Sequence, residues 1–162
     1  MKTRIAAALI ALIAASATQA QQGVVTERGI SANAAVEAAL AAQERCRADG
    51  YKVTITVLNH HGRTAVVLAD DGVNPHTIEN SLRKAYPAFT TRTSTAEMGK
   101  RPQIALAGFM LLENITPQEG GLPIFAGRDL VGAVGISGAP GGDKDGACAK
   151  AGIDKIARLL GN

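Results

Sequence analysis

The fold is decided by residues 120–142, which read GGLPIFAGRDLVGAVGISGAPGG. Two apolar runs, 122–126 and 130–137, flank the short turn Gly127-Arg128-Asp129. Apolar runs of this length, joined by a turn that contains glycine, are typical of a β-hairpin. Gly132 and Gly135 interrupt the second run, which indicates bulges or places where another backbone packs closely.

A second hairpin is predicted earlier in the chain. Apolar residues alternate along 52–58, the turn 59–62 reads NHHG, and a returning strand is expected over 63–69. Because tight turns join the strands in pairs, the sheet is expected to be antiparallel and not a doubly wound parallel sheet. We therefore predict an α/β protein of the α+β type, with an antiparallel sheet of about five strands flanked by helices.

The helices flank these hairpins. Ser31 is predicted to cap a helix that runs to about Asp49, with an apolar stripe marked by Val36, Leu40 and Cys46. A second helix is predicted to begin at a capping Thr77 and to be kinked or ended by Pro87. The remaining predictions are a helical turn opened by the capping-box pattern of residues 94–97, a last helix from about Lys144 to Leu160, and an apolar segment, 104–112, that fits either a strand or a helix.

The first twenty residues have the pattern of a cleavable signal peptide. Lys2 and Arg4 precede an unbroken apolar stretch, 5–15, and small or polar residues follow as far as Ala20. The apolar stretch is shorter than the roughly 20 residues that a permanent membrane anchor needs. We expect cleavage after Ala20, a single domain over residues 21–162, and a periplasmic or secreted location.

The amino-acid composition argues against nucleic acid and membranes as binding partners. The chain has 17 Lys and Arg residues against 14 Asp and Glu, and loss of Lys2 and Arg4 with the signal leaves 15 against 14. No basic stripe remains that would indicate nucleic acid binding. The chain has no Trp, two Tyr and three Phe, so few aromatic side chains are available for base stacking. No second apolar run reaches membrane-spanning length, so no membrane insertion is expected after cleavage.

The residues around the second hairpin resemble the GlcG/HbpS-like haem-binding family, which includes the C-terminal domain of PduO-type proteins. The motifs that carry the resemblance are Gly120-Gly121-Leu122-Pro123-Ile124, the runs 130–138 and 139–145, Cys148-Ala149-Lys150-Ala151-Gly152, Asn74-Pro75-His76-Thr77 and Arg83-Lys84-Ala85-Tyr86. The resemblance implies an exported protein that binds haem or a related tetrapyrrole. It also implies a homo-oligomer.

A ligand pocket is predicted beside the glycine pair of the second hairpin. Gly120 and Gly121 offer a backbone that a ligand can approach closely, and Pro123, Lys84 and Asp145 are further candidates for lining a small polar pocket. The alternative is structural: the glycines simply permit a tight fold, and Lys84 and Asp145 lie on helix surfaces.

The three histidines are candidate haem or metal ligands. His60 and His61 lie at the predicted hairpin tip, where a solvated turn is the alternative. His76 precedes a predicted helix, whose dipole favours the neutral imidazole that binds iron, with capping or packing as the alternative. No pair of ligands has the short spacing of a closed zinc site. Asn59 departs from the acidic residue that the family commonly has there, which puts an inherited ligand set in doubt.

Cys46 and Cys148 are the two cysteines, and two cysteines in an exported protein suggest a disulfide. The family fold implies that their helices cover the same face of the sheet, which would make the two cysteines neighbours. Two buried free thiols are the alternative.

Catalytic patterns are absent from the sequence. No serine lies in a nucleophile-elbow context, and no Ser-His-Asp arrangement can be identified. This favours a binding protein over an enzyme. The alternative is a small-molecule enzyme, or a haem-degrading protein, that acts at the Gly120–Gly121 pocket.

Overall fold

The computed structural model describes residue 23 and residues 25–161. The predicted signal peptide, residues 1–20, lies outside the described residues. Within the described part of the chain, no helix is long and apolar enough to cross a membrane.

The core of the protein is a four-stranded antiparallel sheet with the strand order β2-β1-β4-β3. The strands are β1 (Thr54–Leu58), β2 (Thr64–Ala69), β3 (Gly121–Ala126) and β4 (Asp129–Ser137). Both predicted hairpins are confirmed, and β1 pairs with β4 to join them into one sheet. The expected number of about five strands is too high for the described residues, because the apolar segment 104–112 is helical.

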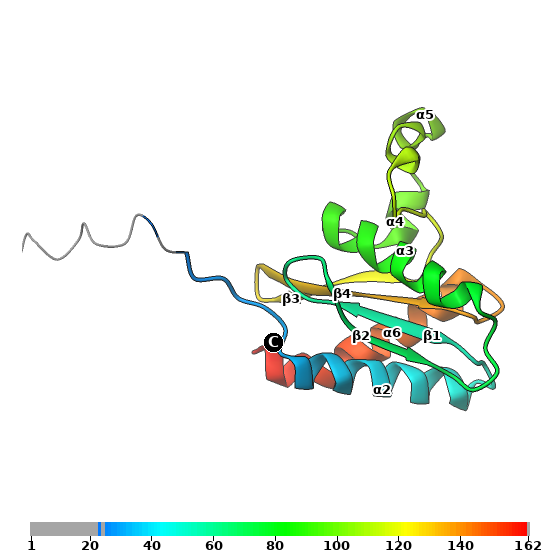
Figure 1. The fold of residues 1–162 in the computed structure, drawn as a ribbon, viewed down its shortest axis with the longest axis horizontal. Coiled ribbons are helices and arrows are strands. Elements are labelled where there is room, and N and C mark those ends of the chain that lie inside the picture. The colour runs from blue at the N-terminus through cyan, green and yellow to red at the C-terminus, as the bar shows by residue number, and fades with distance from the viewer. Residues whose placement is uncertain (1–22, 24, 162) are drawn as a thin grey trace, which may run out of the picture.

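Helices cover both faces of this sheet (Figure 1). Helices α2 (Ala32–Ala48) and α6 (Gly142–Ile156) lie side by side on one face, and α3 (His76–Thr91) lies on the other. The alternation in β1 explains this layering. Ile55 and Val57 of β1, and Val53 just before it, belong to the main core cluster with α2 and α6. The Thr54 and Thr56 hydroxyls of β1 hydrogen-bond to hydroxyls of α3.

Helix α2 buries Cys46 of the predicted stripe but not Val36 and Leu40. Its side chains Val36 and Leu40 are 45% and 51% exposed, so they do not form the buried stripe. The helix packs instead through alanines at positions 34, 35, 38, 39 and 42. Small side chains are required there because α6 comes very close: a Cβ on Gly152 would lie 2.5 Å from the Ala38 carbonyl oxygen. The predicted cap Ser31 is confirmed, since its hydroxyl accepts from the Ala34 N–H.

Cys46 and Cys148 form a disulfide that joins α2 to α6. Both residues are fully buried, and their Cα atoms lie 5.6 Å apart. Both helices cover the same face of the sheet, as the family resemblance implied. The alternative of two free thiols is therefore wrong for this structure.

Helix α3 begins earlier and ends later than predicted. The N-cap is Pro75, not Thr77, and the Thr77 hydroxyl donates to the Asn74 carbonyl instead of capping the helix. Pro87 lies inside the helix, which continues to Thr91 and ends at Arg92, where φ is 56°. Because Pro87 is buried, packing against the rest of the protein offsets the backbone hydrogen bond that a proline removes.

Two glycines of β4 allow close backbone approaches, Gly135 to α3 and Gly132 to β1. A Cβ on Gly135 would lie 2.1 Å from the Ser81 carbonyl oxygen of α3, and one on Gly132 would lie 2.4 Å from the Leu58 carbonyl oxygen. These contacts confirm that the glycines of the second hairpin mark close approaches of the backbone.

Residues 95–118 form an arm that extends from the α3 side of the sheet (Figure 1). The arm contains α4 (Thr95–Gly99), α5 (Gln103–Ala107) and the 3-10 helix η1 (Phe109–Leu111). The predicted cap of α4 is confirmed, because the Ser94 hydroxyl accepts from the Glu97 N–H. The arm has its own small core of Met98, Leu106 and Ile115, packed against Tyr86 and Phe109.

The last helix, α6, begins at Gly142, two residues before the predicted start. It ends at Ile156, and a 3-10 helix, η2 (Ala157–Leu160), follows it.

Candidate functional site

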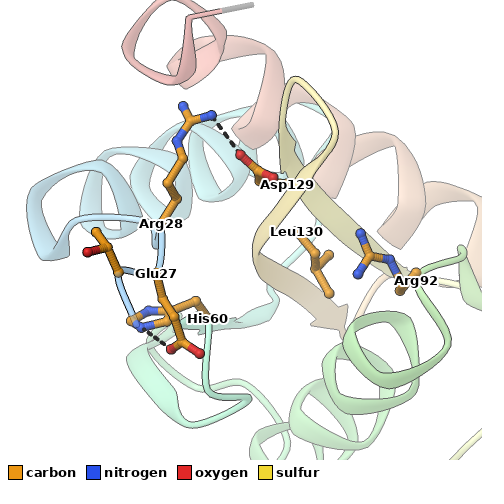
Figure 2. A pocket seen from close by; sticks show the side chains of 7 residues that line it. Glu27, Arg28, His60, Arg92, Asp129 and Leu130 are labelled. Atoms are coloured by element: carbon orange, nitrogen blue, oxygen red, sulfur yellow. Dashed lines mark hydrogen bonds and ion pairs between the residues drawn. The ribbon is translucent and has the colours of Figure 1, made fainter. Parts of the chain in front are cut away.

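An open pocket of about 410 Å³ lies at the tip of the first hairpin. Four separate parts of the chain line it: residues 26–28 before α2, His60 in the turn between β1 and β2, Arg92 after α3, and residues 129–130 at the start of β4 (Figure 2). The segment before α2 is held in place because the Ile30 N–H donates to the Val131 carbonyl at 2.9 Å. We refer to this site as the hairpin pocket.

Two arginines border the hairpin pocket on different sides (Figure 2). Arg28 pairs with Asp129, with 2.8 Å between Nη1 and Oδ2. The Arg92 guanidinium lies 5.7 Å from the centre of the Phe125 ring and donates to the Arg128 carbonyl. The carboxylates of Glu27 and Asp129 also line the pocket, so its border carries charges of both signs. Both guanidiniums have further N–H groups that can bind an anionic group.

The two histidines of the turn face one carboxylate. Oε2 of Glu27 lies 3.6 Å from Nε2 of His60 and 3.7 Å from Nδ1 of His61. The two imidazole rings lie 3.8 Å apart between their centres and are tilted by 42°. Figure 2 shows the Glu27 carboxylate against the His60 ring.

His60 is held by packing. Its ring lies so close to Gly29 that a Cβ there would fall 2.1 Å from Nδ1. This Nδ1 atom is buried and has no hydrogen-bond partner within the described residues. A buried polar atom without a partner costs free energy and asks for an explanation, such as a ligand that uses the same ring.

Asn59 shapes the turn that carries the histidines. Its side-chain oxygen accepts from the backbone N–H groups of His61 and Arg63, at 2.9 Å and 3.2 Å. Gly62 completes the turn with a φ of 70°, which a glycine adopts without strain. The departure from the family pattern at Asn59 therefore has a structural role here, because it fixes where His60 and His61 point.

His76 lies elsewhere. It is exposed in the first turn of α3 and lines a separate pocket of about 490 Å³, with Asn80, Gln118 and Ser137. Ser137 ends β4, whereas the hairpin pocket lies at the start of that strand. The structure thus brings His60 and His61 together and leaves His76 at the opposite end of the sheet.

Lys84 and Asp145 form a buried ion pair. The Lys84 ammonium donates to Asp145 at 2.7 Å, and the two side chains are 4% and 3% exposed. The other oxygen of Asp145 accepts from the Ala139 N–H. Burial raises the pKa of the Asp145 carboxyl, and the hydrogen bond from Lys84 opposes this rise. The alternative that these residues lie on helix surfaces is therefore wrong.

The glycine pair closes over this ion pair. Gly120 has a φ of 123°, and a Cβ there would lie 2.8 Å from the Asp145 Cβ. A Cβ on Gly121 would lie 2.0 Å from the Lys84 carbonyl oxygen. Both glycines also line a pocket of about 320 Å³ between the arm and α6. The half-buried Pro123 pairs with Ala133 in the sheet and does not line that pocket.

The family follows from comparison with known proteins. A family model described as haem degrading protein HbpS-like matches residues 30–154. The chain belongs to the HbpS-like family. A Citrobacter freundii protein, described as an uncharacterised 15.0 kDa protein in the dhaT-dhaS intergenic region, is 31% identical over 113 residues, which are 67% of this chain and 80% of that protein.

Solved structures of the family share the fold. The crystal structure of HbpS has 32% sequence identity to this chain and a TM-score of 0.77, and the alignment covers 85% of this chain and 94% of HbpS. The structure of a PduOC–haem complex has 25% sequence identity and a TM-score of 0.73, and the alignment covers 79% of this chain and 95% of the PduOC chain. An antiparallel sheet flanked by helices is thus the fold that this HbpS-like chain has in common with both.

Among the residues of the hairpin pocket that sequence reasoning missed are Glu27, Arg28 and Arg92. No spacing or motif links them to the histidines, because they are brought to the pocket by segments before α2 and after α3. Their positions depend on long-range pairing such as that between Ile30 and Val131.

Proposed function

We propose that this HbpS-like protein is an exported haem-binding protein and that haem binds in the hairpin pocket. Membership of the family and the likeness to a structure of a haem complex support haem as the ligand. The observation that carries the choice of site is that the His60 imidazole, with the His61 ring 3.8 Å from it, lies at one pocket with the guanidiniums of Arg28 and Arg92. Its volume of about 410 Å³ lies within the range of about 300–1,000 Å³ that is usual for small-molecule and cofactor sites.

Each of these groups has a role that suits haem. An imidazole nitrogen is a common axial ligand of haem iron, and His60 and His61 each offer one. The propionates of haem are carboxylates, which guanidinium groups bind well, so Arg28 and Arg92 are the residues that would hold them. The half-buried Leu130 adds apolar surface to the lining. The haem, when bound, would supply the iron and any redox chemistry.

The pocket at His76 fits haem less well. It offers one imidazole and one arginine, Arg83, which is paired with Glu79 at 2.6 Å. At the hairpin pocket a second imidazole, His61, lies beside His60, and a second arginine, Arg92, lines the pocket with Arg28. A His76→Ala variant is therefore a matched control for the hairpin pocket, since it removes an exposed histidine elsewhere.

A haemin titration tests the proposal. Binding to the purified mature protein should shift the Soret band of haemin, with saturation at one haemin per chain. The His60→Ala/His61→Ala variant should not produce this shift. The His76→Ala variant should titrate like the wild type. If His76→Ala alone abolishes the shift, the site is wrong, and a spectrum of free haemin throughout would refute haem binding. Decay of the Soret band after a reductant is added would indicate haem degradation, the activity in the family's description.

The export part of the proposal has a structural support. Disulfides persist in oxidising compartments, and the Cys46–Cys148 bond is buried in the fold. We expect that residues 1–20 are a signal peptide and that the mature chain begins at Gln21. The intact mass of protein from the periplasmic fraction or the medium should match cleavage after Ala20, and an uncleaved mass would contradict this.

The proposal includes self-association. The arm exposes Ile104 and Leu111, both 87% exposed, next to the exposed Leu112. Large apolar side chains that cluster on a surface are typical of protein–protein contacts. We expect an oligomer in light scattering that Ile104→Glu/Leu111→Glu dissociates. Leu159→Glu, an exposed leucine outside the arm, should leave the oligomer intact. A monomeric wild type would refute this part of the proposal.

A further inference from the structure

We propose that Glu27, His60 and His61 form a binding site for a free divalent transition-metal ion. Two imidazole nitrogens and one carboxylate oxygen are a usual ligand set for Zn²⁺ and for other first-row dications. The three ligand atoms all lie within 4.8 Å of one another. The proposal concerns the ion alone and holds whether or not the protein binds haem.

The distances suit coordination. Two ligands that each lie about 2.05 Å from a tetrahedral zinc ion are about 3.3 Å apart. The Glu27 oxygen is 3.6 Å from His60 Nε2 and 3.7 Å from His61 Nδ1. Closing these gaps takes only a few tenths of an ångström. The Glu27 and His61 side chains are both exposed enough to make such a shift.

The electrostatic surroundings also favour a cation. The ion pairs described for the Glu27 carboxylate join it to the two imidazoles and to no Lys or Arg. Its neighbour Arg28 is directed to Asp129. An imidazole offers a positive charge only when it is protonated, whereas a bound dication would compensate the carboxylate at any pH at which it binds.

The His60 ring is unusual for a structural histidine. Its Nδ1 has no hydrogen-bond partner within the described residues, and Nε2 lies too far from Glu27 for a good hydrogen bond. The ring is positioned by packing against Gly29 and the His61 ring and not by a hydrogen bond, so Nε2 is available to coordinate an ion. Metal-bound histidines are usually oriented by a hydrogen bond to the other nitrogen, which His60 lacks. We therefore expect moderate affinity and not the tight binding of a structural zinc site.

Three protein ligands leave a coordination position open. The site lies at the rim of an open pocket, so water or a small ligand can occupy this position. Nitrogen-containing ligand sets favour Zn²⁺, Ni²⁺, Co²⁺ and Cu²⁺ over Mg²⁺ and Ca²⁺, which prefer oxygen ligands. The same imidazoles are the proposed haem ligands, so a free ion and haem should compete.

Calorimetric titration of haem-free mature protein with Zn²⁺ tests the site. We expect one saturable site, no binding of Mg²⁺, and affinity reduced more than about tenfold by Glu27→Gln or His61→Ala, since even outer partners of metal ligands contribute 10–100-fold. Glu79→Gln and His76→Ala are controls that remove a carboxylate or an imidazole elsewhere and should leave affinity unchanged. Unchanged affinity in Glu27→Gln, or loss in His76→Ala, would overturn the proposal.

Cobalt spectroscopy gives a second readout that does not depend on affinity. Co²⁺ bound by these ligands should give visible ligand-field bands, which His60→Ala should abolish. Gly29→Ala keeps all three ligands but displaces the His60 ring, so it should change the bands while circular dichroism confirms folding. Bands identical to the wild type in both variants would place the ion elsewhere. Haemin binding of the wild-type protein is measured separately, so absence of Zn²⁺ and Co²⁺ binding in a protein that still binds haemin would refute the ion site alone.

Discussion

Removing the disulfide between α2 and α6 should strongly destabilise the protein. The bond joins residues 102 positions apart, so it restricts the unfolded chain over most of its length. In the chain-entropy model, a loop of this size contributes about 4.7 kcal/mol to the free energy of unfolding at 25 °C. The perturbation is Cys46→Ala/Cys148→Ala, compared with the reduced wild type, which keeps both sulfur atoms.

The expected change in melting temperature follows from the size of the domain. A domain of about 140 residues has an unfolding entropy near 0.3 kcal/mol/K, so a loss of about 4.7 kcal/mol lowers the melting temperature by about 15 °C. The double variant also loses two fully buried sulfur atoms, at about 1 kcal/mol each. It should therefore melt slightly below the reduced wild type.

Urea unfolding and thermal unfolding of the oxidised, reduced and double-variant proteins, both followed by circular dichroism, measure the differences in free energy and in melting temperature. Thiol counting with and without reductant confirms the redox state of each sample. If the oxidised and reduced proteins unfold within about 1 kcal/mol of each other, the entropic reasoning is refuted. If the reduced protein is stable and only the double variant is not, packing of the sulfur atoms and not the cross-link stabilises the fold.

Substitutions at the buried ion pair and at a strand glycine test the interior. Lys84→Met leaves the buried Asp145 carboxylate unpaired and should cost about 3–5 kcal/mol in urea unfolding, whereas Lys84→Met/Asp145→Leu should recover most of it; a single variant within about 1 kcal/mol of the wild type would contradict this. Lys84 lowers the Asp145 pKa, so Lys84→Met raises a folded-state pKa that burial already holds above the unfolded value. When the folded-state pKa of a carboxyl lies above its unfolded-state pKa, the stability that the bound proton contributes is present below the unfolded-state pKa. This stability is lost as the pH rises through the folded-state pKa. The free energy of unfolding that Lys84→Met loses should therefore be smaller at about pH 5 than at about pH 7. Gly135→Ala drives a Cβ against the Ser81 carbonyl and should cost about 3 kcal/mol, while Gly108→Ala meets no atom within 4 Å and should be neutral; equal effects would show that the close contact is not tight.

Local patterns predicted most of the fold. The alternation in residues 52–58 and the turn at 127–129 are local signals, and both hairpins are confirmed. The stripe of α2 was predicted wrongly because periodicity alone favours Val36 and Leu40, whereas the close contact with α6 requires alanines. That contact depends on Gly152, more than a hundred residues away, and no local pattern reveals it.

The candidate site was predicted by residue type and not by arrangement. His60 and His61 were identified because imidazoles are ligands, but nothing in the sequence separates them from His76. Glu27 joins them because the segment before α2 runs past the turn between β1 and β2, which is a property of the folded chain. Lys84 and Asp145 were identified through the family resemblance, and their mutual burial became visible only in the structure.

The arm has a consequence for how the protein responds to a protease. Residues 100–112 lie outside the sheet, between the half of the chain that holds β1 and β2 and the half that holds β3 and β4. A cut there would leave Cys46 on one fragment and Cys148 on the other, still joined by their disulfide. Nicked protein would run as one species on a non-reducing gel and as two on a reducing gel. Each fragment would carry one complete hairpin, and the pairing of β1 with β4 would form the sheet contact between the two fragments.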